Sequence, residues 1–349
     1  MYKKTIIKIM SGLALSLVLL SAGCKKENKS SDEYHITHAN TYNMYTTCEY
    51  SAEEKANVQA FLKTYYKVIA GKAYFNLRSM DSDVFNMSPE DIKNTAYGVI
   101  IADEVGFSYD KDKVDLYMTS AESAMKSEND MYKCAEYLKY YTMYRFYRHN
   151  YTFTEEDVEF AQSKLDDLIE SLGSSSDKMK ELETLDIMAQ VFSFYKAGFP
   201  GTNLHIMITK EQKNKIKDFI SVFCKYEHYV NDISSFAKIY EIDDLFNLEF
   251  ISDTENAVAI HAYEKLDDSV SCVDVYKWYS WSNTYHKANF DEEIHDKIKE
   301  YLNSIRIKKG IYGKKSENNT YYDLESIACG NCLEDRVEQW KNAVKIEEE

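Results

Sequence analysis

The chain has 349 residues, with 58 acidic and 42 basic side chains and a formal net charge of −16 at pH 7. So acidic a protein repels the phosphate backbone of nucleic acids and anionic lipid head groups, so no nucleic acid is expected as a partner. The only prolines are Pro89 and Pro200, and this scarcity removes the usual breakers of long helices.

The first 23 residues have the pattern of a secretory signal. Lys3, Lys4 and Lys8 form a basic start, and residues 9–20 are almost wholly apolar. The apolar run is shorter than the roughly 20 residues that a membrane-spanning helix needs. We therefore predict that residues 1–23 are a signal peptide that is removed, rather than a membrane anchor.

The signal ends in the sequence Leu20-Ser21-Ala22-Gly23-Cys24. It resembles the lipobox of bacterial lipoproteins, in which the cysteine is diacylated on its sulfur before the signal is cut; the family prefers leucine three places before the cysteine, where this chain has Ser21. The resemblance implies that Cys24 carries the lipid and that the protein is anchored on the extracytoplasmic side of the cell membrane or the outer membrane. Two acyl chains give stable anchoring. The alternative is an ordinary signal peptide followed by a chance cysteine.

Residues 24–47 are polar and have no apolar period. This composition predicts a flexible tether from the lipidated cysteine. The remaining residues, 48–349, are enough for one large core or two modest domains.

From Ser51 onward, apolar residues recur at intervals near 3.6 and helix-start signals are frequent. The start signals are Ser51-x-x-Glu54, Ser88-Pro89, Thr154-Glu155-Glu156-Asp157 and Thr209-x-x-Gln212. No alternating strand pattern of comparable length competes with them. The predicted fold class is all-α.

Four octets carry apolar residues at positions 1, 4, 5 and 8, and they begin at Val114, Leu165, Ile216 and Ile298. Each of the last three follows an aromatic-rich helix and a charged helix start. The steps between octets are about 51, 51 and 82 residues, and the longest is expected to contain one degenerate unit around residues 257–266. Periods of this size indicate repeated helical hairpins, either closed into an α/α-toroid or open as an α-solenoid.

The last repeat contains Gly310-Ile-Tyr312-Gly313, followed by Thr320-Tyr321-Tyr322. It resembles the repeat of the α/α-toroid superfamily that includes protein prenyltransferase β-subunits and terpenoid cyclases, where a Gly-aromatic-Gly turn precedes a Thr-Tyr-Tyr helix start. The resemblance implies a helix start at Thr320-Tyr321-Tyr322, and residues 321–328 are themselves predicted to be helical. The catalytic residues of the family do not carry over, because no Asp-x-Asp-Asp motif is present. A zinc set of Asp268 and Cys272 with His286 or His295 does not match in spacing.

Six cysteines follow Cys24, and they are Cys48, Cys134, Cys224, Cys272, Cys329 and Cys332. An exported protein can form disulfides, but six cysteines allow 15 pairings and the sequence selects none. Cys329-Gly-Asn-Cys332 is a C-x-x-C motif, for which a structural role is favoured over a redox dithiol or half of a zinc site. A redox motif follows a strand, whereas the preceding stretch is predicted to be helical.

Candidate ligand contacts come from two aromatic helices, and they are Tyr144, Arg145, Arg148, His149, Tyr276 and Trp278. Arginine and tyrosine together can bind an anionic or aromatic ligand, although core tyrosines beside surface arginines would give the same pattern. The 30 tyrosines suit a sugar or a protein contact as well.

No phosphate loop, nucleophile elbow or zinc-protease motif is present. We therefore expect a membrane-anchored extracytoplasmic lipoprotein that acts as a non-catalytic binding module for an unknown protein, peptide or carbohydrate ligand, without cofactor or metal. The alternative is an α/α-toroid enzyme acting on an isoprenoid, a peptide or a polysaccharide.

Overall fold

The computed structural model describes residues 33–35, 48–76, 87–148, 154–198, 207–224, 232–252, 259–284, 290–315 and 320–348. These ranges contain eleven α-helices and a few short strands, and this confirms the all-α class. The chain divides into two units, Met1–Glu33 and Tyr34–Glu349, and the described helices belong to the second. None of the described helices is both long enough and apolar enough to span a bilayer.

The helix-start signals lie where the sequence places them. Helices α3 (Ala52–Tyr65), α4 (Pro89–Val105), α7 (Glu155–Ser171) and α9 (Lys210–Ser221) begin after Ser51, Ser88, Thr154 and Thr209. Each of these residues forms a capping box with the third helical residue, which satisfies two backbone N–H groups that the helix itself leaves unpaired.

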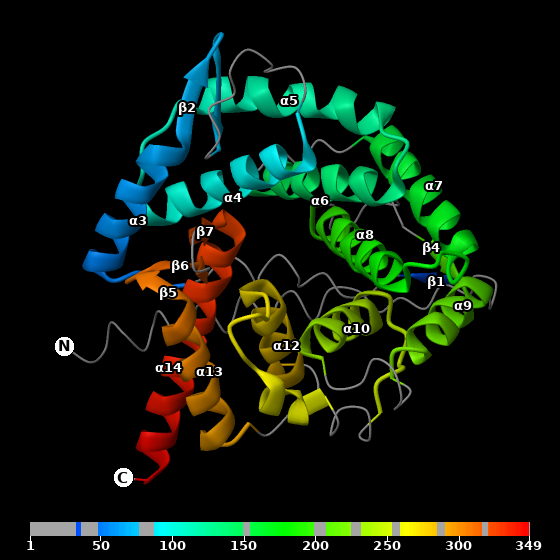
Figure 1. Ribbon diagram of the computed structural model, residues 1–349. Coiled ribbons are helices and arrows are strands. Elements are labelled where there is room, and N and C mark those ends of the chain that lie inside the picture. Colours follow the sequence, from blue (N-terminus) through cyan, green and yellow to red (C-terminus); the bar gives the residue numbers. More distant parts are fainter. Residues whose placement is uncertain are drawn as a thin grey trace, which may run out of the picture. The chain divides into compact units, whose positions relative to one another are not determined.

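Six helices form a closed cycle of contacts (Figure 1). They are α4, α6 (Met131–Tyr147), α8 (Lys178–Gly198), α10 (Ile233–Leu245), α12 (Cys272–Thr284) and α14 (Leu324–Glu348). Each packs against the next in this order, and α14 packs against α4. We call these six the inner helices. Most described positions of α6 and α10 are buried, so these helices have neighbours on nearly all sides.

The four apolar octets lie on helices that connect consecutive inner helices. These helices are α5 (Lys111–Ser127), α7, α9 and α13 (Glu292–Ile305). Every apolar position of the four octets is buried except Leu172, which is half-buried. The predicted buried face of the repeat is therefore confirmed, and the aromatic helices that precede the octets are the inner helices.

The degenerate unit expected around residues 257–266 is described only from residue 259 onward. Residues 253–258 lie outside the described part, and a 3-10 helix, η1 (His261–Lys265), follows them. It lies between α10 and α12 in the chain, as the other connecting helices lie between their inner helices.

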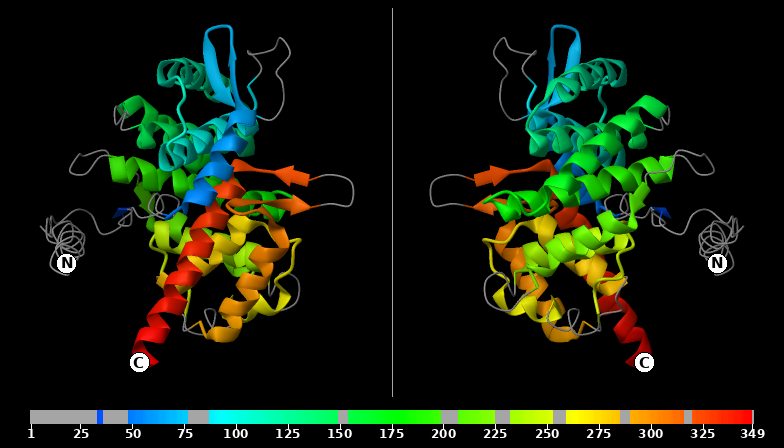
Figure 2. Two further views of the ribbon diagram at one scale, coloured as in Figure 1. Left: turned by 90° about the vertical axis from the view of Figure 1, so that its left-hand side faces the viewer. Right: turned by 90° about the vertical axis from the view of Figure 1, so that its right-hand side faces the viewer.

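Two small antiparallel sheets were not expected from the sequence. Strand β2 (Tyr66–Ile69) pairs with β3 (Lys72–Phe75), and this hairpin stands at the edge of the helical layers (Figure 2). Its turn uses positive φ angles at Ala70 and Gly71. Such turns usually carry Asn-Gly or Asp-Gly, so alanine at the first position concealed the hairpin signal.

The second sheet corrects the prediction for the last repeat. Strands β5 (Arg306–Lys308), β6 (Ile311–Lys315) and β7 (Thr320–Tyr322) form a three-stranded sheet. Gly310, at φ +78°, makes the turn between β5 and β6, and Tyr321 and Tyr322 lie in a strand rather than at a helix start. The predicted helix over residues 321–328 was wrong at its beginning, because α14 starts at Leu324.

Of the predicted tether, residues 24–47, only Glu33–His35 lie inside the described part. They form a short strand, β1, where an irregular chain was expected. The remaining described strand, β4 (Met207–Thr209), leads directly into α9.

Candidate functional site

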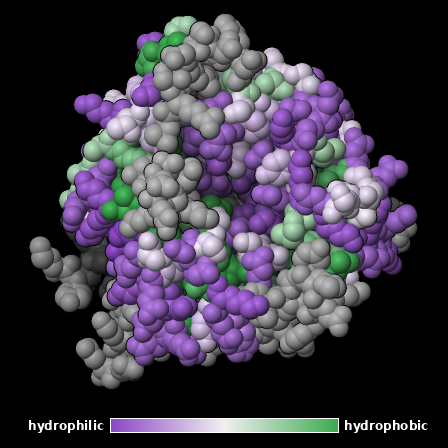
Figure 3. All heavy atoms as spheres, in the orientation of Figure 1, coloured by the Kyte–Doolittle hydropathy of each residue, from purple (hydrophilic) through white to green (hydrophobic). Residues whose placement is uncertain are grey.

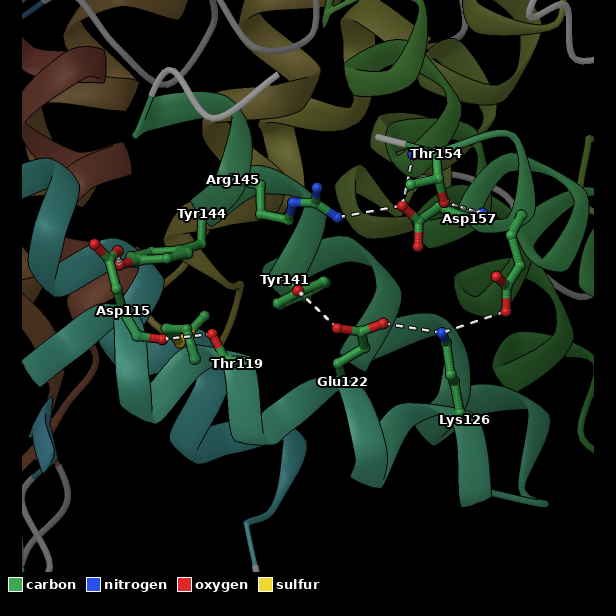
Figure 4. Close-up of a pocket in the computed structure, with 11 residues that line it drawn as sticks. Asp115, Thr119, Glu122, Lys126, Tyr141, Tyr144, Arg145, Thr154 and Asp157 are labelled. Atoms are coloured by element: carbon green, nitrogen blue, oxygen red, sulfur yellow. Dashed lines mark hydrogen bonds and ion pairs between the residues drawn. The ribbon is translucent and has the colours of Figure 1, made fainter. Parts of the chain in front are cut away.

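A polar cavity of about 380 Å³ lies between α5, α6 and the start of α7 (Figure 4). Its volume falls at the lower end of the roughly 300–1,000 Å³ that is typical of small-molecule sites. Its lining residues are Asp115, Met118, Thr119, Glu122, Lys126, Tyr141, Tyr144, Arg145, Thr154, Glu156 and Asp157. We call it the α5–α7 pocket. Figure 3 shows mainly hydrophilic side chains over the nearby helix α7.

Asp157 fixes the α7 side of the pocket. Its carboxylate accepts a hydrogen bond from the backbone N–H of Thr154 at 2.8 Å, and the Thr154 hydroxyl accepts one from the backbone N–H of Asp157. The Arg145 guanidinium from α6 lies 3.3 Å from the same carboxylate. The Asp157 carboxylate therefore already occupies both the start of α7 and the guanidinium of Arg145.

Asp115 fixes the opposite side of the pocket. It accepts hydrogen bonds from the hydroxyl of Tyr144 and from the guanidinium of Arg148, the latter at 3.3 Å. Burial raises the pKa of Tyr144 well above its usual range, and the Asp115 carboxylate adds to the shift. The phenol therefore remains protonated and acts as a donor to Asp115.

Glu122 and Lys126 form the floor between these two sides. The Lys126 ammonium lies 2.9 Å from Glu122 and 3.8 Å from Glu156. The hydroxyl of Tyr141 donates to Glu122 at 3.3 Å, and the Arg145 guanidinium lies 5.5 Å from the centre of the Tyr141 ring. Four carboxylates and two cations line the pocket, so the lining is net negative.

The structure brings together only some of the residues singled out from the sequence. Tyr144 and Arg145 line the pocket, and Arg148 reaches its edge through Asp115. His149 lies outside the described residues.

Tyr276 and Trp278 lie on α12, a different part of the fold. Trp278 is fully buried and donates from its indole nitrogen to the backbone carbonyl of Ala259 at 2.9 Å. Tyr276 is buried beneath the guanidinium of Arg336, which lies 5.2 Å from its ring centre. Neither residue shares the α5–α7 pocket.

The contribution of α5 to the pocket was not predicted from the sequence. Asp115, Thr119, Glu122 and Lys126 are spaced by four, three and four residues, which places them on one face of a helix. That polar stripe runs beside the apolar octet that begins at Val114. The spacing was available in the sequence, but the partner helices that turn the stripe into a pocket were not.

A second polar group of side chains lies among the inner helices. Its members, the interior cluster, are Tyr97, Lys139, Asp186, Gln190, Glu241, Lys277 and Glu325. Lys139 on α6 lies 3.4 Å from Glu325 on α14, although α4 stands between these helices in the cycle. Lys277 on α12 likewise reaches Asp186 on α8 at 2.8 Å across α10. The interior cluster therefore connects inner helices that are not neighbours.

Asp186 and Glu241 of the interior cluster differ in their tendency to hold a proton. The ammonium of Lys277 contacts both Asp186 at 2.8 Å and Glu241 at 2.5 Å, and all three side chains are at most 4% exposed. Burial raises the pKa of Glu241 well above its usual range, and the nearby Asp186 adds to the shift against the opposing Lys277. Glu241 is therefore the protonated member, and Asp186 pairs with Lys277 as the ion.

The residues considered as zinc ligands in the sequence, Asp268 and Cys272 with His286 or His295, do not form a metal site among the described residues. Asp268 is exposed, whereas Cys272 is buried, and His286 lies outside the described residues. His295 uses one ring nitrogen with the Tyr279 hydroxyl at 3.0 Å and the other with the Asp291 carbonyl at 2.7 Å. In the part of the chain that the structure describes, no three His, Cys, Asp or Glu side chains gather as metal ligands.

Comparisons with models of protein families, with curated proteins and with solved structures return no match for this chain.

Proposed function

We propose that this protein is a lipid-anchored extracytoplasmic binding protein and that its α5–α7 pocket takes a neutral ligand rich in hydroxyl groups, such as a saccharide. The lipobox at Cys24 supports the anchor, and the net charge disfavours nucleic acid. The pocket geometry supports the choice of ligand.

The observation that carries the proposal is the internal pairing of the cations. Lys126 and Arg145 each lie within ion-pair distance of a carboxylate, and Arg148 at the edge pairs with Asp115. An anionic ligand would have to displace these carboxylates and would meet a net negative lining. An anion is therefore a poor match for this pocket.

A saccharide suits this pocket, because a carboxylate that is already paired still has free acceptor sites on its two oxygens. Carboxylate oxygens of Asp115 and Glu122 and the hydroxyl of Thr119 can accept hydrogen bonds from sugar hydroxyls. Such bonds to ionised acceptors are stronger than those between neutral groups. Tyr141 and Tyr144 add an aromatic wall on which the apolar C–H face of a sugar ring can pack.

A thermal-shift screen of the full-length protein in detergent tests the ligand class. Maltose and cellobiose serve as neutral probes, glucuronic acid and inorganic phosphate as anionic probes, and spermidine as a cationic probe. A ligand that binds only the folded state raises the melting temperature in proportion to its occupancy. We expect a saturable rise with a neutral saccharide. A rise with glucuronic acid or phosphate alone would overturn the proposed ligand class.

One observation favours a second candidate, a toroid enzyme. Asp186 and Glu241 have opposed proton affinities, which is the pattern of paired catalytic carboxyl groups. Both are nearly completely buried, so a substrate reaches them only if the inner helices separate. Release of reducing sugar from cellobiose or maltose by the wild type, and its loss in Glu241→Gln, would favour the enzyme over the binding protein.

A further inference from the structure

The sulfur atoms of Cys48 and Cys332 lie 2.6 Å apart. Non-bonded sulfur atoms do not approach so closely, and only a small movement separates this contact from a covalent bond of about 2.05 Å. The two residues are 284 positions apart in the sequence. Cys48 precedes α3, and Cys332 lies inside α14.

Other contacts hold the same two regions together. The side-chain amide of Asn57 on α3 donates to the carbonyl of Lys309 at 3.0 Å, and the Lys309 ammonium lies 3.5 Å from Glu53. Asn331, beside Cys332, donates from its side-chain amide to the carbonyl of Gly310 at 2.9 Å. The β5–β6 turn is therefore fixed to both α3 and α14, so the meeting of the two sulfur atoms does not depend on the cysteines alone.

The geometry disfavours a local disulfide between Cys329 and Cys332. Both residues lie within the continuous helix α14, where side chains three apart have Cβ atoms about 5–6 Å apart, whereas a disulfide needs about 3.5–4.5 Å. Between them, Gly330 leaves room for the ring of Tyr312, with which a Cβ atom at this position would collide. The middle of the C-x-x-C motif thus serves packing.

The motif also lacks the features of a redox-active dithiol. Reactive cysteines are partly exposed and have a lowered pKa, often at the start of a helix. Cys329 and Cys332 are buried in the helix interior, and burial raises the pKa of Cys329 well above its usual range. Neither thiol is presented as a nucleophile to solvent.

We propose that Cys48 and Cys332 form a disulfide in the mature protein and that Cys329 remains a free thiol. The two thiols lose two protons and two electrons as one S–S bond forms. The electron acceptor is the disulfide of a thiol–disulfide exchange partner, which is reduced to two thiols, as in extracytoplasmic compartments.

This disulfide joins the two ends of the helical repeat. The inner helices form a cycle whose last contact, between α14 and α4, is the most distant in the sequence, and α3 packs against α4 at that place. A bond from the residue before α3 to α14 therefore fastens the contact that closes the cycle. Because it closes a very long loop, it restricts the unfolded chain strongly. The proposal does not depend on the α5–α7 pocket.

Peptide mapping without reduction tests the pairing. The full-length protein is extracted with a thiol-blocking reagent present and digested with trypsin, which places Cys48 on peptide 30–55 and both motif cysteines on peptide 316–336. We expect these two peptides to be linked, with Cys329 carrying the blocking group. A link within peptide 316–336, or Cys48 and Cys332 both blocked, would contradict the pairing in the cell.

Oxidation of the purified protein tests whether Cys48 and Cys332 pair, independently of the compartment in which the protein is found. The fully reduced full-length protein is incubated with oxidised glutathione and mapped again. Cys329→Ser should still form the link, and Cys332→Ser should not. Breaking the link should lower the melting temperature by roughly 5–10 °C. In the matched variant Cys134→Ser the link is intact, so adding a reductant should still lower the melting temperature, as it does in the wild type. If no link between Cys48 and Cys332 forms even after oxidation, the proposal is wrong.

Discussion

The hydroxyl of Tyr97 on α4 donates a hydrogen bond of 2.8 Å to the carboxylate of Glu325 on α14. The two residues are 228 positions apart and connect the first and last inner helices. Burial acts to raise the pKa of Glu325, but Lys139, Lys93 and the Tyr97 hydroxyl together lower it to about 2. The carboxylate is therefore ionised at neutral pH and depends on these partners.

Tyr97→Phe should weaken the closing contact while keeping the ring in place. A hydrogen bond to a charged acceptor contributes about 1.5–3 kcal/mol, so the free energy of unfolding should fall by an amount in that range. Tyr109→Phe is the matched control, because its hydroxyl contacts the exposed Asp103 at 3.2 Å, and we expect a change within about 0.5 kcal/mol. Urea unfolding followed by circular dichroism measures both. Equal losses in the two variants would show that the Tyr97 bond has no special role.

The raised pKa values of two carboxyl groups predict that the protein loses stability as the pH rises. Burial raises the pKa of Glu104 to about 8, against an opposing hydrogen bond from Tyr50. Burial and then the charge of Asp243 raise the pKa of Asp244 to about 7. A group whose pKa is higher in the folded state contributes stability below its unfolded pKa, and that stability is lost as the pH rises through the folded pKa.

The melting temperature should therefore fall by several degrees between about pH 5.5 and about pH 8.5. Glu104→Gln should make this fall smaller, because glutamine cannot ionise while Asp244 still titrates, whereas the exposed change Glu53→Gln should leave the profile as it is. A flat profile in the wild type would contradict the assignment of raised pKa values to Glu104 and Asp244.

The repeat can be tested at Phe219, a buried octet position of α9 whose ring lies 5.4 Å from that of Phe223. Phe219→Asp places an unpaired charge in the packed face and should cost about 3–5 kcal/mol, a large part of the stability of a domain. Lys217→Asp, at a half-exposed position of the same octet, should stay within about 0.5 kcal/mol. Thermal melts compare the two. The repeat would have to be abandoned if Lys217→Asp proved the more damaging.

Local signals in the sequence predicted the helices well. The capping boxes at Ser51 and Thr209 and the octets that begin at Ile216 and Ile298 depend on neighbours within a few residues, so the chain itself reveals them. Strand β7 was not predicted, because Thr320-Tyr321-Tyr322 suits either a strand or a helix start. Pairing with β6 decides between the two.

The candidate site was predictable only in part. Tyr144 and Arg145 were predicted as ligand contacts because an aromatic and a basic side chain lie on one helix. Their partners Asp115 and Asp157 come from two other helices. The interior cluster was not found from sequence, since Lys277 and Asp186 are 91 residues apart and meet only when the cycle of inner helices forms. Contacts of this kind depend on tertiary packing, which local patterns do not specify.

Cys24→Ala should release the protein from the membrane or misdirect it, because lipid on Cys24 is the proposed anchor and no described helix is long and apolar enough to span a bilayer. Metabolic labelling with a fatty-acid analogue, followed by fractionation of membranes, measures the effect. Cys48→Ala is the control and should keep the label. Equal labelling of the wild type and Cys24→Ala would contradict the proposal that the protein is a lipoprotein.

The most direct test of the proposed function is calorimetric titration of the neutral saccharide that gives the largest thermal shift into the full-length protein and its pocket variants. Glu122→Gln removes an ionised acceptor worth about 1.5–3 kcal/mol, so the dissociation constant should rise at least about tenfold, and Thr119→Val should weaken binding in the same direction. Glu159→Gln, an exposed change on α7 outside the pocket, should leave the constant within about twofold, as exposed surface substitutions usually do. Binding of the saccharide with the same affinity by Glu122→Gln, Thr119→Val and Glu159→Gln would show that the α5–α7 pocket is not the site.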